Sequence, residues 1–381
     1  MQFRNVVVIA TAAFGLAITP GTARAQDERL TIHGSVNIGY GKTDGLPYFG
    51  MTKDGTSEMR AVALQFGYKL GDKDRLVTQF LHRKFGRSPL NAVEPDFFPV
   101  WAFYEHKFDN GFGVKLGRTP LPRGIYNEVR FIGTLLPFYR TGSVVYGETL
   151  ENLDGAVVSK TFEAGGFKIE SHVFGGGFDL KYQVPSASGN AVGNSRQEST
   201  VGAQAWVTTP IPGVKLGGFV ANFASVPRLT VPKAQRPGRT TTAMYSVDAT
   251  YDRGFVRGEW TTFDGKGPGS RTNFDAWYAQ GGVNVTEKIL FAVEYDFGNN
   301  RATLPSPIPA IDIPITKDFG AGITFKPTPG VAFKFEGHRN EGYQFDVPVP
   351  TVIAPTQPPL VARLAPAGKA FYGIASVAVA F

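Results

Sequence analysis

The chain ends in the stretch Phe371-Tyr-Gly-Ile-Ala-Ser-Val-Ala-Val-Ala-Phe381, in which apolar residues recur at every second position. One face would carry Phe371, Ala375, Val377, Val379 and Phe381, and the other would carry Ser376, Ala378 and Ala380. A repeat of two residues is typical of a β-strand, because successive side chains of a strand point to opposite faces. The pattern therefore predicts a terminal strand that Phe381 closes.

Residues 1–25 have the features of a secretory signal. Arg4 precedes an apolar run from Val6 to Ile18, and Ala23-Arg24-Ala25 follows as a cleavage site. The apolar run is too short to cross a bilayer as a helix. We therefore expect cleavage after Ala25, the alternative being a retained anchor. Later apolar stretches are interrupted by polar residues or glycine, so any contact with lipid would be made by strands.

The composition fits a secreted β-protein without disulfide bonds. The 381 residues include 46 Gly, 27 Pro and no Cys, so stability must come from a large core or from a closed hydrogen-bonded barrel. A mean hydropathy of -0.10 agrees with strands that alternate between a lipid face and a wet face. The net charge is +7, and removing Arg4 and Arg24 with the signal lowers it. The remaining basic excess hints at a preference for anions. Nucleic-acid binding is not expected, because there is no run of Lys and Arg.

The mature sequence divides into alternating strands joined in turn by short turns and long loops. Strands are predicted at residues 29–40, 58–70, 75–85, 100–108 and 112–118, and the face assignment of 75–85 is ambiguous. The sequence Asp109-Asn110-Gly111 is typical of a tight hairpin, because Asn and Gly accept a positive φ. Long loops are expected around residues 119–152, 175–196, 225–240, 298–316 and 341–368. Both termini lie on the short-turn side, so the number of strands is even, and we count about sixteen.

The alternation of residues in several predicted strands indicates which face meets lipid. Ile289, Phe291, Val293, Tyr295 and Phe297 alternate with small or acidic residues, and the runs from residues 167 and 331 behave in the same way. The opposite faces carry charges of both signs, as the wall of a water-filled lumen would. A soluble periplasmic β-sandwich would also alternate, and it remains the alternative fold.

The whole mature chain resembles the sixteen-stranded porins of Gram-negative outer membranes in length, strand rhythm and terminal Phe381. The stretch G-R-x-x-x-P-x-G-x-Y-N-E-x-R, residues 117–130, is similar to a segment of proteobacterial porin-like proteins, including relatives of phosphate-selective porins. Where that pattern often continues with Asp, this chain has Phe131. The resemblance implies an all-β transmembrane antiparallel up-and-down barrel, a third loop near residues 119–152 folded into the lumen, a homotrimer, and recognition of Phe381 by the barrel-assembly machinery.

Charges cluster in and beside this third loop. Fixed charges in the wall of a pore concentrate counter-ions, and Arg suits the task because it stays charged and binds carboxylate or phosphate in a bidentate manner. The alternative is that these arginines pair with Glu128, Glu148 or Glu151 and hold the shape of the loop. The predicted constriction and selectivity residues are Lys115, Arg118, Arg123, Glu128, Arg130 and Arg140.

An enzymatic function is not predicted. His33, Ser35 and Asn37 are similar to the His/Ser/Asn group of outer-membrane phospholipase barrels, but strand parity points all three into the lumen instead of toward lipid. The five histidines are scattered without metal-ligand spacing, so no metal and no cofactor is expected.

We therefore expect an outer-membrane porin for passive diffusion of small hydrophilic solutes. The alternative is a barrel that acts as an adhesin or receptor through its long loops. Two of these loops, 298–316 and 341–368, are rich in Pro and apolar residues. They either roof the pore or bind a partner.

Overall fold

The structure is a computed structural model. It describes residues 29–86, 88, 97–147, 150–184, 191–227, 238–267, 269–303, 310–342, 351–352, 363–364 and 368–381. Side chains are described for these residues except 181–184, 191–194, 226–227, 311, 351–352 and 363–364. The expected signal at residues 1–25, Glu148 and most of the Pro-rich loop at 341–368 lie outside the described residues.

Sixteen strands of the described chain close into one antiparallel barrel, as predicted. Each strand pairs with its neighbour in sequence, and the last strand, β18, pairs with β1. Their bounds are β1 Leu30–Thr43, β2 Thr56–Lys69, β3 Asp74–Phe85, β4 Phe98–Lys107, β5 Phe112–Pro120, β6 Asn152–Ala164, β7 Phe167–Val184, β8 Ala191–Thr208, β9 Val214–Pro227, β10 Gly238–Tyr251, β11 Gly254–Gly267, β12 Ser270–Thr286, β13 Ile289–Thr303, β14 Ile311–Thr328, β15 Val331–Gly342 and β18 Gly368–Ala380. The short strands β16 (Thr351–Val352) and β17 (Arg363–Leu364) pair outside the barrel.

The terminal strand closes the barrel by pairing with β1, and its outward face is the predicted one. Val36 of β1 lies opposite Val379 of β18, and the backbone of Phe381 exchanges two hydrogen bonds of 3.0 Å with Gly34. The Phe381 side chain is 70 % exposed on the outer wall. A closed barrel leaves no unpaired strand edge, which is the condition for β-structure in hydrocarbon.

The alternation of residues also follows the predicted faces. On β13, Ile289 and Phe291 are exposed outside the barrel, whereas Glu294 and Asp296 are buried inside it. On β15, Phe335 is 63 % exposed, whereas Lys334 and Glu336 point inward and are buried. The outer wall is therefore largely apolar and the inner wall polar, as lipid outside and water inside require. None of the described residues lies in a helix long and apolar enough to span a membrane.

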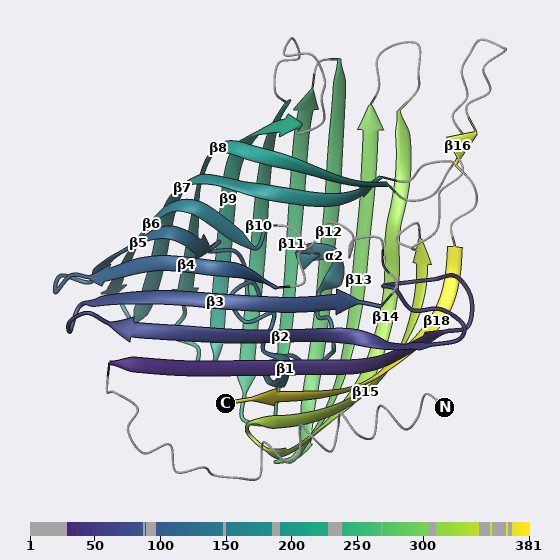
Figure 1. Cartoon of the computed structure of the whole chain (residues 1–381), viewed down its shortest axis with the longest axis horizontal. Helices are drawn as coiled ribbons and strands as arrows, with labels where there is room; N and C mark the ends of the chain where they lie inside the picture. Colours follow the sequence, from purple (N-terminus) through teal and green to yellow (C-terminus); the bar gives the residue numbers. More distant parts are fainter. Residues whose placement is uncertain are drawn as a thin grey trace.

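The wall is not equally tall all the way round. The strands β4 and β5 have 10 and 9 residues, whereas β7 and β14 have 18 each. Figure 1 shows β1–β8 on the near side of the barrel, crossing the strands on the far side, with α2 (Ser143–Tyr146) between the two walls. The low wall at β4 and β5 is where the chain leaves the sheet and enters the lumen. The predicted loop at 298–316 is shorter than expected, because β13 continues to Thr303 and β14 begins at Ile311.

Candidate functional site

The described residues of 121–151, here called the constriction loop, fold into the barrel between β5 and β6. The loop contains the 3-10 turn η2 (Gly133–Leu135) and the short helix α2. η2 packs against β1, β15 and β18, and α2 packs against β11, β12 and β13. The loop therefore extends from the low wall at β5 and β6 to both of these parts of the wall (Figure 1).

Close packing of the backbone at Gly124 against side chains fixes the start of the loop. Gly124 has a φ of +62°, and a Cβ there would lie 2.3 Å from the Tyr146 hydroxyl oxygen and 2.5 Å from Oε1 of Glu259. Only glycine combines that conformation with that lack of space. The Asn127 side-chain amide donates to the carbonyls of Leu121 (2.8 Å) and Glu151 (3.1 Å), so it joins the two ends of the loop.

One buried carboxylate of the opposite wall holds the loop. Glu259 of β11 is 2 % exposed and accepts hydrogen bonds from Ile125 N (2.9 Å) and from the Tyr146 hydroxyl, both in the loop. It also accepts from Ser246 Oγ (2.5 Å) and Tyr278 OH (2.8 Å) of neighbouring strands. Two donors of the loop and two donors of the wall thus share one buried carboxylate, which joins the loop to the wall.

A row of further inward-facing charges continues this attachment. The backbone amides of Gly142 and Tyr139 donate to Glu294 (3.1 Å) and Glu336 (2.8 Å). Lys334 Nζ donates to the carbonyl of Phe138 (3.1 Å). Sequence parity places these charged residues in the lumen correctly. Their contacts, however, show that they bind the constriction loop instead of lining free water.

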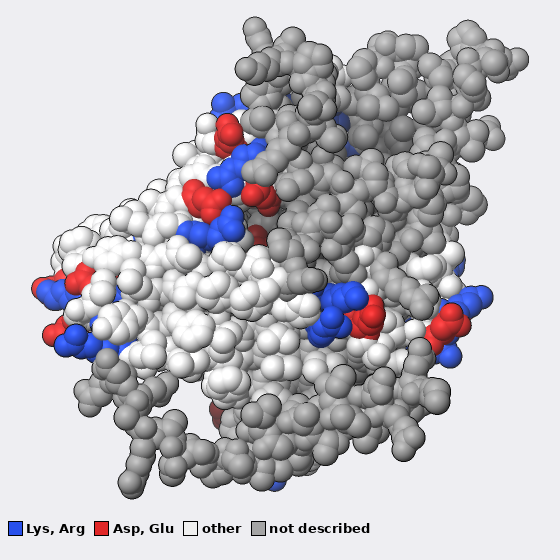
Figure 2. Space-filling view, in the orientation of Figure 1, with Lys and Arg blue, Asp and Glu red and all other residues white. Residues whose placement is uncertain are grey.

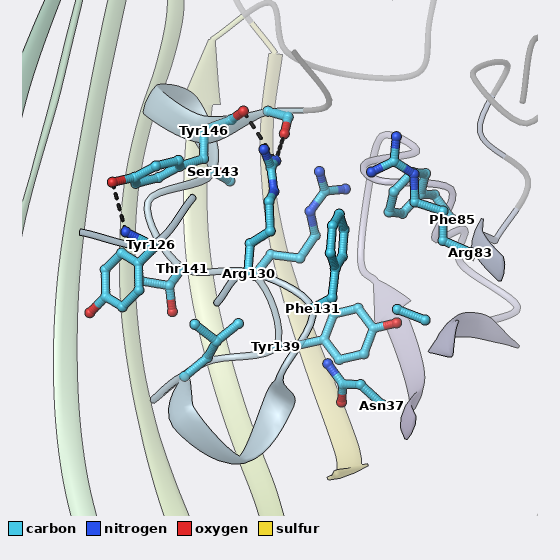
Figure 3. Close-up of a pocket in the computed structure, with 14 residues that line it drawn as sticks. Asn37, Arg83, Phe85, Tyr126, Arg130, Phe131, Tyr139, Thr141, Ser143 and Tyr146 are labelled. Carbon is cyan, nitrogen blue, oxygen red and sulfur yellow. Dashed lines mark hydrogen bonds between the residues drawn. The ribbon is translucent and has the colours of Figure 1, made fainter. Parts of the chain in front are cut away.

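Arginine side chains gather on the other side of the loop, where it faces β2 and β3. Arg130 and Arg140 of the loop and Arg83 of β3 line one cavity, which encloses about 610 Å³ of empty space, counting the part that opens to solvent. Figure 3 shows this cavity between the loop and the wall, with Phe131 between the arginines and Tyr139 and Asn37 below. The cavity thus combines positive charge with aromatic rings.

The contacts of these arginines hold them in place. Arg83 Nη1 lies 2.5 Å from Glu151 Oε1, and Arg130 Nη1 lies 3.6 Å from the same atom. Arg130 also donates to the carbonyls of Tyr146 (3.1 Å) and Gly147. The Arg140 guanidinium lies over two rings, 4.0 Å from the centre of Phe49 and 4.6 Å from that of Phe85.

Three guanidinium groups share the lining of this cavity. Burial, together with the like charges of Arg130 and Arg83, lowers the pKa of Arg140 to about 10. Even so, Arg140 stays charged at neutral pH. Glu151 pairs with two of the three arginines, Arg83 and Arg130.

The other predicted loop residues lie elsewhere. Arg123 is 1 % exposed. Its Nη2 donates to the Val145 carbonyl (2.9 Å), and burial lowers its pKa to about 10. It therefore supports the inside of the loop. Glu128 is exposed, and together with Lys115 on the inner face of β5 it acts electrostatically on His172. Lys115, Glu128 and His172 mark a second charged region of the lumen, apart from the cavity.

The prediction that Arg118 lines the constriction is wrong, because Arg118 lies on the outer wall. It pairs across strands with Asp154, on the same face as Leu116, which is 48 % exposed outside the barrel. Its guanidinium binds Asp154 at 2.7 and 3.3 Å, and Arg196 binds the same carboxylate at 2.8 Å. Arg196 also lies 3.7 Å from Asp179. Figure 2 shows this charged patch on an otherwise mostly uncharged outer face.

The residues considered for catalysis belong to the lumen wall. Ser35 Oγ donates to the carbonyl of Phe131 (2.9 Å), so its hydroxyl supports the constriction loop, and its direction into the lumen is as predicted. Within the described part of the chain, no group of three or more His, Asp or Glu side chains could hold a metal ion.

The comparisons with known proteins agree with this architecture. No protein-family model matches the sequence, and the curated proteins give no match. Among solved structures, OmpF of Salmonella typhi in complex with daunomycin aligns over 92 % of this chain and 97 % of that one, with a TM-score of 0.59 and 10 % identity. OmpT of Vibrio cholerae aligns over 92 % and 97 % with a TM-score of 0.55 and 12 % identity. The anion-selective porin of Comamonas acidovorans aligns over 92 % and 99 % with a TM-score of 0.53 and 12 % identity. The chain therefore has the fold of the Gram-negative outer-membrane porins.

Proposed function

We propose that this protein is an outer-membrane porin through which small hydrophilic solutes diffuse passively. The closed barrel with an apolar outer wall, a polar inner wall and an inserted loop supports this proposal. Diffusion through such a channel needs no covalent step and no cofactor, so we assign no catalytic residue. We also propose that residues 1–25 are removed on export and that Phe381 directs assembly into the outer membrane.

We further propose that the channel prefers anions, and the cavity at Arg83, Arg130 and Arg140 is the observation that carries this proposal. Three guanidinium groups beside the constriction would raise the local concentration of anions and lower that of cations. Glu128 and Lys115 face the lumen in another region and adjust the local field. The same fold carries anion selectivity in the porin of Comamonas acidovorans.

The reversal potential in a salt gradient tests the preference. Arg130→Gln and Arg140→Gln together should shift it toward the value of an unselective pore, because both positive charges beside the constriction are lost. Arg301→Gln is the matched control, since the Arg301 side chain is 59 % exposed on β13, far along the sequence from the constriction loop. Equal reversal potentials in the wild type and the double variant would refute the assignment.

We propose a homotrimer as the assembled form, with the outer face of β5–β8 in the subunit interface. An Arg or Lys on a lipid-facing strand costs about 2–4 kcal/mol at the bilayer midplane and less toward the interfaces, and an Asp or Glu costs less than either. Four charged residues, Arg118, Asp154, Asp179 and Arg196, share this face. Contact with another subunit would remove them from lipid. One similar structure, OmpT of Vibrio cholerae, is described in its trimer form.

A further inference from the structure

We infer that a phosphorylated membrane lipid binds the outer wall of the barrel through three basic side chains, Lys317, Arg339 and Lys369, here called the basic rim. They belong to β14, β15 and β18, which lie side by side in the sheet (Figure 1). The inference goes beyond the proposed channel function, because this surface faces lipid and not the lumen.

The strand register places the basic rim on the outer face. Phe371, which is 59 % exposed on the outer wall, lies opposite Arg339. Lys369 lies two residues before Phe371 and opposite Glu341, and Glu341 lies opposite Lys317 on its other side. Residues two apart along a strand share a face, as do residues directly opposite each other on neighbouring strands. All three basic side chains therefore point outward, and all three residues are exposed.

The basic rim lies directly above a band of uncharged, mostly apolar residues. The outward residues of this band are Phe319, Ala321, Ile323 and Phe325 on β14, Val331, Phe333, Phe335 and Gly337 on β15, and Phe371, Gly373, Ala375, Val377 and Val379 on β18. The rim lies at the end of the barrel that bears the long loops, which is the extracellular end in this class of barrel. The rim is therefore level with the lipid head groups of the outer leaflet, and the acyl chains cover the band below it.

Acidic groups do not neutralise the basic rim. Lys369 Nζ lies 3.2 Å from Oε2 of Glu341. The Arg339 guanidinium lies 5.9 Å from the centre of the Phe371 ring. Within the described part of the chain, Lys317 and Arg339 form no ion pair, whereas the outward charges of β5–β8 are paired with one another. Two positive charges therefore remain unpaired at the lipid surface, where anionic head groups attract them.

The spacing and charge of the rim fit one phosphate monoester. Both lysines of the rim are diagonal neighbours of Arg339, so about 7–8 Å separates each from it. Their long side chains can converge on one phosphate group, which accepts several charge-assisted hydrogen bonds. Three positive charges and the one negative charge of Glu341 leave a net charge of +2, and a phosphate monoester carries about −1.5 to −2 at pH 7. Lys42 and Asp44, which lie beside β18, add one charge of each sign.

Native mass spectrometry on the folded protein in detergent tests the inference without depending on transport. The probe is lipid A, a glycolipid that carries phosphate monoesters, and it is compared with the same lipid after removal of its phosphates. We expect lipid A to bind at least about tenfold more tightly, because only its phosphates pair with the basic rim. Equal binding of the two lipids would overturn the inference. Displacement of lipid A by an equal concentration of inorganic phosphate would assign the site to free phosphate and would also overturn it.

Variants then locate the site. Lys317→Gln, Arg339→Gln and Lys369→Gln combined should weaken lipid A binding by about 100-fold, at about fivefold for each charge removed. The matched control combines Lys266→Gln, Arg271→Gln and Arg301→Gln, which remove the same charge from exposed side chains of β11, β12 and β13. The gel shift on heating shows that each variant is folded.

The comparison of the two triple variants decides the assignment. Unchanged binding in the rim variant would place the lipid elsewhere and refute the basic rim. Equal losses in the rim variant and the control would show a general attraction of anionic lipid and would also refute it. A channel current without lipid A binding would reject this inference and keep the proposed function, whereas lipid A binding at the rim without any current would do the reverse.

Discussion

Replacing Glu259 by alanine should release the constriction loop from the far wall. The carboxylate of Glu259 accepts from Ile125 N, Ser246 Oγ, Tyr146 OH and Tyr278 OH. In the variant all four donors lose their acceptor. An unsatisfied buried donor costs about 1–3 kcal/mol. Two of the four donors belong to the loop and return to water when it leaves the wall.

The magnitude follows from those two loop donors. At about 1–3 kcal/mol each, their loss weakens the attachment of the loop by about 2–6 kcal/mol. Since about 1.4 kcal/mol is a factor of ten, the detached population should rise by about 30-fold or more. The attachments at Glu294 and Glu336 remain in this variant, so only the half of the loop near Tyr126 and Tyr146 should move.

The chain has no Cys, so a single introduced thiol can report this movement. Val145 is 4 % exposed and apolar, which makes Val145→Cys a suitable probe. Its reaction with a water-soluble thiol reagent should be slow alone and at least about tenfold faster with Glu259→Ala. Glu163→Ala, at the exposed end of β6, is the control. Equal labelling rates with and without Glu259 would refute the proposed attachment.

Three further outcomes are expected. The anion preference read from the reversal potential in a salt gradient should weaken as the pH rises through 10, because Arg140 has a pKa of about 10 and loses its charge; an unchanged reversal potential up to pH 11 would contradict this. Arg118→Leu should leave Asp154 without one partner on the outer wall, and its trimer should dissociate at a lower temperature on a native gel than that of the control Arg239→Leu, at an exposed position of β10; equal dissociation temperatures would contradict the proposed interface. Deleting Phe381 should lower the amount of barrel in the outer membrane several-fold while refolding in detergent continues; equal amounts would exclude a role in assembly.

The fold could be predicted from the sequence because its signals are local. The alternation around Phe291 and Phe335 fixes which face meets lipid, and the terminal run to Phe381 fixes the closing strand. The short turns and long loops fix the topology. Strand ends were less predictable, because β13 and β14 continue past the residues that predict a loop.

The position of Arg118 was predicted wrongly, although the sequence held the information. Lys115 and Arg118 are three residues apart, so a continuous strand places them on opposite faces. The prolines that follow Arg118 suggested that the strand ends there. In the structure β5 continues to Pro120, with Arg118 still on the outer wall.

The cavity at Arg83, Arg130 and Arg140 was only partly predictable. Arg130 and Arg140 were predicted as constriction residues because they cluster in the inserted loop. Arg83 was missed, because it comes from β3, whose face assignment was ambiguous in the sequence. The contact of Arg83 with Glu151 joins residues 68 positions apart, and no local pattern encodes such a contact. The attachment of the loop to Glu259 was missed for the same reason.

The most direct test of the account is the current through a planar lipid bilayer to which the purified, detergent-folded protein is added. We predict stepwise increases in conductance in chloride salts, with a reversal potential of the sign that indicates anion preference. A folded, heat-shifted barrel that inserts into the bilayer and carries no current would contradict the account.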